Sequence, residues 1–366
     1  MGFKCGIIGL PNVGKSTLFN ALTETMKAEA ANYPFATINP NIGRVAVPDK
    51  RLDKIGEIGK SEKIIPAYMD FVDIAGLVKG ASKGEGLGNK FLAHIREVDA
   101  IAHVVRCFKD DNIAHVSSII NPINDIETVT TELQLADIEI LQSKQASLEK
   151  KSKQGNREIK HQLSLIEQML ENLNQEYQFK KNQFNADDLE FFNSLNLISL
   201  KPILYICNVD EKSIIHGNSL SKLVQEKAKK NNYDSIIVSA SIESQFVELE
   251  NDSDRIQLLK ELGINETTLK KVITAGYSLL DLINYFTCVP KETKSWTIKK
   301  NTLAPQAAGK IHSDFEKGFI RAETISYNDF IEFKGESACR EAGKLRQEGK
   351  DYKVKDGDVI NFLFNV

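Results

Sequence analysis

The segment with the most specific chemistry is the octapeptide Gly9-Leu10-Pro11-Asn12-Val13-Gly14-Lys15-Ser16. It matches the pattern G-x-x-x-x-G-K-[ST] and directly follows an apolar run, Cys5-Gly6-Ile7-Ile8, that is typical of a buried strand. A glycine-rich turn between a strand and a helix directs free backbone N–H groups toward an anion. We therefore predict a nucleoside triphosphate site whose phosphate-binding residues are Asn12, Val13, Gly14, Lys15, Ser16 and Thr17.

Three side chains could hold Mg²⁺ beside these phosphates. The Ser16 hydroxyl follows the lysine of the motif, where a direct metal ligand is expected. Thr37 is the lone threonine of a proline-punctuated loop, residues 32–41, and such a residue senses Mg²⁺ and γ-phosphate in nucleotide switches. Asp73 ends a strand-like run, residues 68–73, and would hold the metal through water. The predicted metal residues are therefore Ser16, Thr37 and Asp73.

Hydrolysis would depend on groups around the motif Asp73-Ile74-Ala75-Gly76. The Gly76 N–H is expected to sense the γ-phosphate. Leu77 occupies the position at which Ras-type enzymes carry a glutamine that orients the attacking water, and leucine has no amide. We therefore expect hydrolysis that is slow, or that depends on a group from another loop or a partner. His115 is the candidate catalytic residue, as base or water positioner, although a structural role is also open.

Base selection is expected at Asn208-Val209-Asp210-Glu211, which follows a strand-like run. GTPases usually carry Asn-Lys-x-Asp here, and the aspartate accepts both guanine N–H groups. Because Glu211 replaces that aspartate, guanine preference should be weak. Adenine could be held by Asn208 and the backbone around Val209. Ser239-Ala240-Ser241 fits the short loop under the base, although Ser241 could equally be a helix N-cap.

The elements around these motifs alternate between short β-rich runs and helical stretches. The β-rich runs cover residues 3–8, 68–73, 100–107, 202–207 and 235–239. This alternation predicts βαβ units and a mostly parallel sheet, with the ligand at the carboxyl ends of the strands.

A different pattern separates the third and fourth of these runs. Apolar residues recur at spacings of three and four on both sides of Gly155-Asn156, which predicts an antiparallel helical hairpin or coiled coil inserted at residues 128–199. Its tip carries an excess of basic residues: Lys144, Lys150, Lys151, Lys153, Arg157 and Lys160. A solvated tip and a contact with RNA or another acidic partner are both compatible with this charge.

Residues 281–366 have the pattern of a separate α+β module. Short β-like runs occur at 295–298, 319–324, 330–333 and 359–364, and one helix-like segment occupies 304–317. We therefore predict a nucleotide-binding domain over residues 1–280, which contains the insertion, followed by the C-terminal module.

The overall composition sets broad limits. The chain has 366 residues, 42% of them hydrophobic and 27% charged, and a net charge of −3, as in an ordinary soluble globular protein. No stretch is long and apolar enough to span a bilayer, so we expect no membrane partner. The first residues enter a strand at once, and the five cysteines are widely spaced, so we expect a cytoplasmic protein with reduced thiols.

The chain resembles the YchF subfamily of Obg-related P-loop NTPases, the Obg-like ATPases. The resemblance is carried by residues 9–16, 32–41, 73–89 and 208–211, and it extends over essentially the whole chain. It includes the helical insertion and a C-terminal segment similar to a TGS domain, which is a ubiquitin-like β-grasp module. The fold implied is an α/β P-loop NTPase with a TRAFAC/Obg-type G domain, an inserted antiparallel helical coiled-coil hairpin and a C-terminal TGS domain.

The resemblance implies binding of ATP in preference to GTP, slow hydrolysis, association with the ribosome and a role in translation or stress response. The leading hypothesis is thus a Mg²⁺-dependent ATPase that docks to the ribosome, with RNA contacts through the basic tip and the TGS module. Two alternatives remain: a nucleotide-regulated adaptor without catalysis, and a conventional GTPase of ribosome assembly in which Glu211 acts as the usual aspartate.

Overall fold

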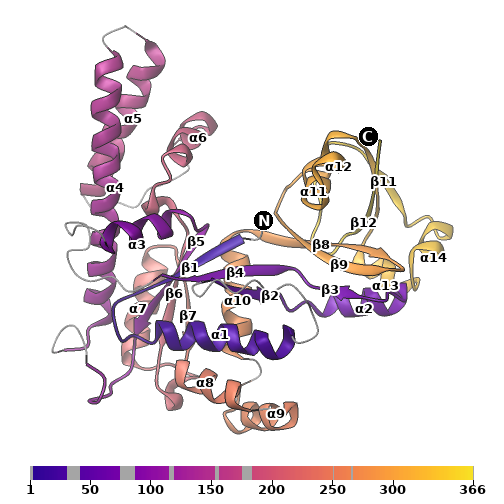
Figure 1. Ribbon diagram of the computed structural model, residues 1–366, viewed down its shortest axis with the longest axis horizontal. Helices are drawn as coiled ribbons and strands as arrows, with labels where there is room; N and C mark the ends of the chain where they lie inside the picture. The colour runs from indigo at the N-terminus through magenta and orange to yellow at the C-terminus, as the bar shows by residue number, and fades with distance from the viewer. Residues whose placement is uncertain are drawn as a thin grey trace. The chain divides into compact units, whose positions relative to one another are not determined.

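The computed structural model describes residues 3–30, 42–74, 87–114, 119–152, 156–174, 184–249, 251–264 and 267–365 (Figure 1). The chain divides into two compact units. One, which we call the C-terminal unit, contains Phe3 together with residues 44–70 and 272–365. The other, the P-loop unit, contains residues 4–43 and 71–271. The predicted domains followed the order of the sequence with a boundary after residue 280, whereas these units join an early segment to the C-terminal part.

The P-loop unit contains the parallel strands β1, β5, β6 and β7 of a sheet with strand order β2-β4-β1-β5-β6-β7. Strand β5 is buried along its whole length, which is typical of a parallel strand covered on both faces. The predicted α/β P-loop fold is thereby confirmed. The strands are β1 (Phe3–Ile8), β2 (Ile42–Ala46), β4 (Tyr68–Asp73), β5 (Ala100–Arg106), β6 (Ile203–Asn208) and β7 (Asp234–Val238).

Helices connect these strands and form a long arm. They are α1 (Lys15–Ala30), α3 (Leu87–Arg96), α4 (Pro122–Ser152), α5 (Arg157–Asn174), α6 (Ala186–Ser194), α7 (Ser219–Lys230), α8 (Ala240–Glu248), α9 (Asp252–Glu261) and α10 (Thr268–Leu279), the last of which ends in the C-terminal unit. None of the helices in the described residues is long and apolar enough to cross a membrane.

The arm consists of α4 and α5, which run alongside each other in Figure 1. Leu141 and Leu148 of α4 are buried with Ile166 and Met169 of α5. Ile166 and Leu173 belong to the apolar spacing that predicted the hairpin, whereas Ile140 and Leu170 of that spacing are only partly buried against this core. Phe192 of α6 completes the same core.

A buried carboxylate fixes the root of the arm. The side chain of Asp137 on α4 is fully buried. It accepts hydrogen bonds from Arg96 Nη1 of α3 at 3.0 Å, from the Ile198 N–H at 3.0 Å and from the Ser199 N–H at 2.7 Å. Because its charge is paired and its oxygens are occupied, Asp137 ties the arm to two other segments of the P-loop unit.

The C-terminal unit has its own mixed sheet, with strand order β11-β10-β12-β8-β9-β3. Strands β8 and β9 form an antiparallel hairpin, and β12 pairs with β8 in parallel. Ala304, Ala307 and Ala308 of α11 are fully buried against Tyr285 and the neighbouring apolar core, so the helix packs closely on the sheet. The strands are β3 (Ile64–Ile65), β8 (Leu282–Val289), β9 (Glu292–Lys299), β10 (Phe319–Ile325), β11 (Arg346–Glu348) and β12 (Val359–Phe364).

Two local predictions in this unit were wrong. The β-like run 330–333 lies at the end of a helix, α13 (Tyr327–Glu332), because the Ser326 hydroxyl accepts from the Asp329 N–H and caps the helix start. The single helix expected over 304–317 is two helices, α11 (Ala304–Ile311) and α12 (Ser313–Lys317), which meet at the extended residue His312. One further short helix, α14 (Glu336–Glu341), follows.

Residues 44–70 complete the C-terminal unit. Asp49 caps α2 (Lys50–Gly59), and the buried Leu52 and Ile55 pack in one core with Phe286 and Phe330. Strand β3 then pairs in parallel with β9. The sheet and core of this unit thus include α2 and β3, which lie more than two hundred residues before β8 in the sequence.

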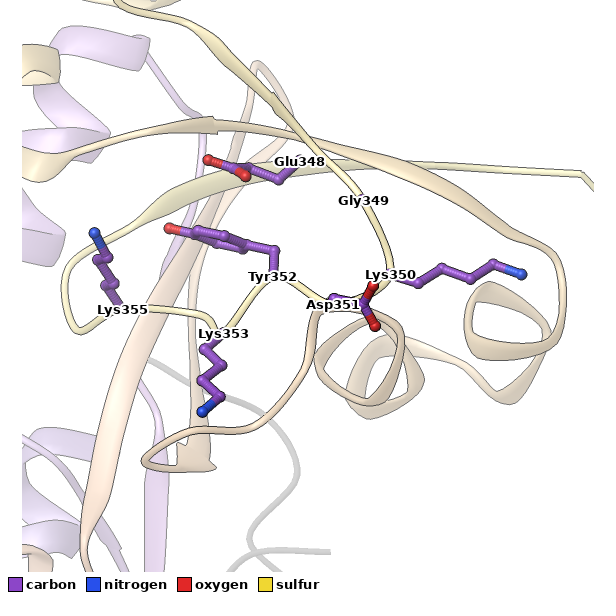
Figure 2. A pocket seen from close by; sticks show the side chains of 7 residues that line it. All are labelled: Glu348, Gly349, Lys350, Asp351, Tyr352, Lys353 and Lys355. Carbon is purple, nitrogen blue, oxygen red and sulfur yellow. The ribbon is translucent and has the colours of Figure 1, made fainter.

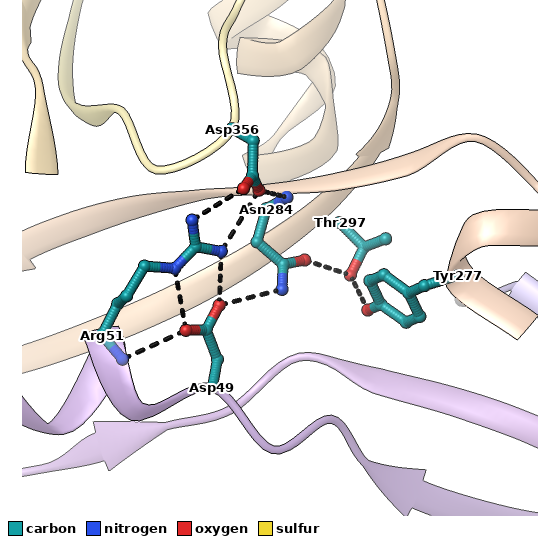
Figure 3. Close-up of polar contacts among 6 residues, drawn as sticks. All are labelled: Asp49, Arg51, Tyr277, Asn284, Thr297 and Asp356. Carbon is teal, nitrogen blue, oxygen red and sulfur yellow. Dashed lines mark hydrogen bonds and ion pairs between the residues drawn. The ribbon is translucent and has the colours of Figure 1, made fainter. Parts of the chain in front are cut away.

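A polar network lies where α2 meets strands β8 and β9 (Figure 3). The Arg51 guanidinium donates to Asp49 at 2.9 and 2.8 Å and to Asp356 at 2.7 and 3.2 Å. The other members are joined to these two carboxylates through hydrogen bonds of Asn284, Thr297 and Tyr277. Both carboxylates receive two donors from one planar group, which fixes the angle between the elements that carry them.

Replacing Asp137 by alanine should lower the free energy of unfolding by about 3 kcal/mol, because it removes the counter-charge of the largely buried Arg96 guanidinium and leaves two backbone N–H groups without their acceptor. Urea unfolding measures this change. The control is Glu127→Ala, which removes an exposed pair with Lys227 at 2.8 Å and should cost less than about 1 kcal/mol. Equal losses for the two variants would contradict the role given to Asp137.

Candidate functional site

The turn between β1 and α1 has the conformation that its glycines require. Gly9 has φ +150° and Gly14 has φ +95°, and the intervening Asn12 is left-handed with φ +60°. A Cβ on Gly9 would lie 2.4 Å from the Val104 carbonyl oxygen, and one on Gly14 would lie 2.3 Å from Asn208 Nδ2. Both positions therefore exclude side chains on conformational and steric grounds.

The Asn208 side chain holds this turn in place. Its Nδ2 donates to the Val13 carbonyl at 2.9 Å, and its Oδ1 accepts from the Ala240 N–H at 3.0 Å. The residue is 4% exposed. Asn208 was predicted to hold the base, and that role stays a prediction; what the structure shows is that its amide joins the turn to the first residue of α8.

Lys15 is buried beneath the turn. The residue is 7% exposed, and its Nζ donates to the Leu10 carbonyl at 2.6 Å. Burial lowers the pKa of Lys15 to about 8, and the negative charge of Asp73 partly offsets this effect. An anion bound in the turn would supply the counter-charge that this ammonium lacks.

Asp73 lies at the end of β4 with one oxygen unsatisfied. Its Oδ1 is buried and has no hydrogen-bond partner among the described residues. Burial also raises the pKa of this carboxyl, and the charge of Lys15 partly offsets that effect. A buried carboxylate oxygen without a protein donor fits a hydrated cation, and Ser16 contributes an exposed hydroxyl in the first turn of α1.

These groups suit Mg²⁺ held together with a nucleotide better than a metal held by protein alone. In the part of the chain that the structure describes, no cluster of three or more His, Cys, Asp or Glu side chains could hold an ion. Mg²⁺ commonly uses one or two protein groups, water and substrate phosphates. Ser16 and Asp73 fit that pattern, and Thr17 stands beside Ser16 on the same exposed helix turn.

The predicted base end of the site lies after β6 and β7. Val209 is 2% exposed, and its N–H donates to the Val238 carbonyl at 2.9 Å. Ser239 precedes α8, and its Oγ is buried without a hydrogen-bond partner in the described structure. Ser241 is not the N-cap of α8, which is Ser239; its hydroxyl instead donates to Glu211.

Three predicted residues, Thr37, Gly76 and His115, lie outside the described residues, so their roles remain predictions. The structure does reach the residue before His115: Asn12 Nδ2 donates to the Ala114 carbonyl at 3.2 Å. The chain that leads to His115 therefore passes beside the turn between β1 and α1.

Arg106 is a residue that the sequence analysis did not identify. It is 1% exposed at the end of β5 and donates to the carbonyls of Phe108, Asp110 and Ile113 at 3.0 to 3.3 Å. These bonds order the loop that precedes His115. A charged residue at the end of a strand that is apolar apart from His103 was the available signal in the sequence.

A separate open pocket of about 580 Å³ lies on the loop 348–355 of the C-terminal unit (Figure 2). Lys350, Lys353 and Lys355 line it, but Figure 2 shows their side chains pointing in different directions. They do not converge on a single point, so the pocket is a weaker candidate for a phosphate site than the turn around Lys15.

Gly14→Ala should weaken binding of a fluorescent ATP analogue at least about tenfold, because the new Cβ collides with Asn208 at a backbone angle that alanine resists. Fluorescence titration measures the affinity. Gly349→Ala is the matched control: a Cβ at that position would have no atom within 4 Å, so the affinity should be unchanged. Unaltered binding by the Gly14 variant would show that the turn does not hold the phosphates.

Two family models match the chain. Residues 4–144 match a model described as a 50S ribosome-binding GTPase. Residues 282–365 match the C-terminal model of the YchF GTPase, which is described as a protein of unknown function.

Similar proteins cover the chain from end to end. The ribosome-binding ATPase YchF of Pasteurella multocida is 53% identical over 366 residues, and that of Bacillus subtilis is 49% identical over 368 residues, each covering 100% of both chains. The solved structure of the Schizosaccharomyces pombe YchF GTPase has a TM-score of 0.88 and 39% identity, and the match covers 99% of this chain and 98% of that one. Full-length identity at this level, together with the P-loop geometry, shows that the chain belongs to the YchF family.

Proposed function

We propose that this protein is a Mg²⁺-dependent, slowly hydrolysing ATPase that prefers ATP to GTP and associates with the ribosome in translation or stress response. The proposal rests mainly on two charged groups that are buried together. Lys15 is buried, and Asp73 has a buried oxygen with no hydrogen-bond partner among the described residues. The turn that carries Lys15 has glycines where a side chain would collide with neighbouring atoms. Relatives that are similar over their full length are named ribosome-binding ATPases, which supports the choice of nucleotide and partner.

The proposed chemistry assigns each residue a local task. Backbone N–H groups of residues 12–17 and the Lys15 ammonium hold the phosphates. Ser16, Thr37 and Asp73 hold Mg²⁺, which when bound neutralises charge on the phosphate oxygens. The Gly76 N–H orients toward the γ-phosphate. His115 accepts a hydrogen bond from the attacking water, a task that Leu77 cannot perform.

Base preference follows from the residues after β6. Val209 replaces the lysine that GTPases usually carry, and it is buried in the apolar core beneath the proposed base site. Glu211 replaces the aspartate, and its carboxylate is engaged by two donors from α8. Asn208 and the Val209 backbone therefore form the proposed adenine contact.

Two observations keep the alternatives in view. Leu77 favours a nucleotide-regulated adaptor, in which turnover is incidental. The description of the matching N-terminal model as a GTPase favours a conventional GTPase of ribosome assembly. Stimulation of hydrolysis by ribosomes would argue against the adaptor. Competition between ATP and GTP for the site would test the conventional GTPase, which should bind GTP more tightly.

Single-turnover hydrolysis of ATP with and without ribosomes tests the proposal. We expect slow hydrolysis by the protein alone and stimulation of about tenfold or more by ribosomes, because the water lacks an orienting amide until a partner docks. Lys15→Ala should abolish binding and turnover, and His115→Ala should slow turnover while ATP affinity is retained. The same slow rate with and without ribosomes would support the adaptor instead.

We also propose that the basic tip of the arm contacts RNA. Lys150, Lys151, Arg157 and Lys160 are exposed, and no ion pair joins them to other described residues. Lys144 lies on the same arm, and Lys153 lies outside the described residues. Unpaired cations at the end of a long projection are accessible to phosphate groups without rearrangement. The loop with Lys350 and Lys353 in the C-terminal unit offers a second basic surface.

The double variant Lys150→Gln/Lys151→Gln should reduce co-sedimentation with ribosomes about fivefold at roughly 0.1 M salt, because two phosphate contacts are lost. Lys229→Gln/Lys230→Gln is the matched control: it removes the same charge from exposed residues at the end of α7. If co-sedimentation with ribosomes falls equally for both variants, the effect comes from net charge and the arm has no specific role.

A further inference from the structure

We propose that Ser241 and Gln245, on the first turns of α8, are specificity-determining residues that favour ATP by holding the Glu211 carboxylate. This inference rests on the proposed function, because it concerns the base end of the same nucleotide site. It explains the proposed preference for ATP by the way Glu211 is held, in addition to the replacement of aspartate by glutamate.

The contacts converge on one oxygen atom. Glu211 begins a short helix, η3 (Glu211–Ser213), three residues after Asn208. Ser241 Oγ donates to Glu211 Oε1 at 2.6 Å, and Gln245 Nε2 donates to the same Oε1 at 2.8 Å. Ser241 and Gln245 are four residues apart and therefore lie on one side of α8. The carboxylate is thus held by two donors from a single rigid element.

This arrangement removes the acceptor pattern that guanine requires. A carboxylate recognises guanine by accepting two neighbouring N–H groups, one on each oxygen. With Oε1 already accepting two hydrogen bonds, Glu211 cannot offer both oxygens at once. Adenine presents a ring nitrogen acceptor beside its amino group, so a carboxylate turned away from the base also avoids repulsion with that nitrogen.

The support for these donors comes from the same junction that orders the phosphate-binding turn. The Ala240 N–H, one residue before Ser241, donates to Asn208 Oδ1 at 3.0 Å. Next to it, Ser239 is fully buried, and its Oγ has no partner within the described residues.

The test compares Kd values of the full-length protein for non-hydrolysable ATP and GTP analogues, by competition with a fluorescent ATP analogue. For the Ser241→Ala/Gln245→Ala variant, the ratio of the GTP Kd to the ATP Kd should fall about tenfold, mainly through tighter GTP binding, because the carboxylate is released. Ser244→Ala is the matched control on the same helix. Its hydroxyl donates to the Ala240 carbonyl at 3.2 Å, and the ratio should not change.

A second variant keeps the test decisive if the double variant unfolds. Gln245→Glu replaces one donor by a like charge beside Glu211 and should shift the ratio in the same direction. An unchanged ratio in folded variants, with ATP still preferred by the parent protein, overturns this inference alone. A parent protein that binds GTP more tightly than ATP overturns the proposed base preference itself.

Discussion

The amide of Asn208 is the interaction on which the nucleotide site depends. One side chain donates to the carbonyl of Val13 and accepts from the N–H of Ala240, so it joins the turn after β1 to the start of α8. The space that this amide occupies is the space that a side chain at Gly14 would need. The proposed phosphate and base ends of the site are therefore joined, and the residue at position 208 restricts the residue at position 14. Such mutual restriction gives the site its preorganised form.

Electrostatics complement this geometry. Burial disfavours the charge on both Lys15 and Asp73, while each partly stabilises the other. A ligand that brings an anion to the ammonium and a cation to the carboxylate satisfies both groups together. Neither ion alone would do so, which gives a physical reason for a site that takes nucleotide and metal as a pair.

The parts of the fold that could be predicted from the sequence are those with short-range signals. The turn around Lys15 is specified by eight consecutive residues, and the parallel strands by apolar runs that end in polar residues. The arm is specified by apolar spacing. The helix at 327–332 was misread as a strand, although Ser326 and Asp329 have the spacing of a helix N-cap and the structure shows the Asp329 N–H donating to the Ser326 hydroxyl. Arg106 was missed because its partners are backbone carbonyls, which no sequence pattern reveals. Thr37, Gly76 and His115 stay predictions.

The association of residues 44–70 with the C-terminal unit could not be predicted, since β3 has only two residues and pairs across a long stretch of sequence. This association has a consequence for genetic recombination as well as for folding. Leu52 and Ile55 share one core with Phe286 and Phe330. Residues from 282 onward therefore cannot be moved into another protein as a complete module unless Leu52 and Ile55 are moved with them. Recombination at that border would leave the apolar face of α2 uncovered in one product and an incomplete core in the other. Residues 44–70 and the stretch from 282 onward are therefore expected to be inherited together.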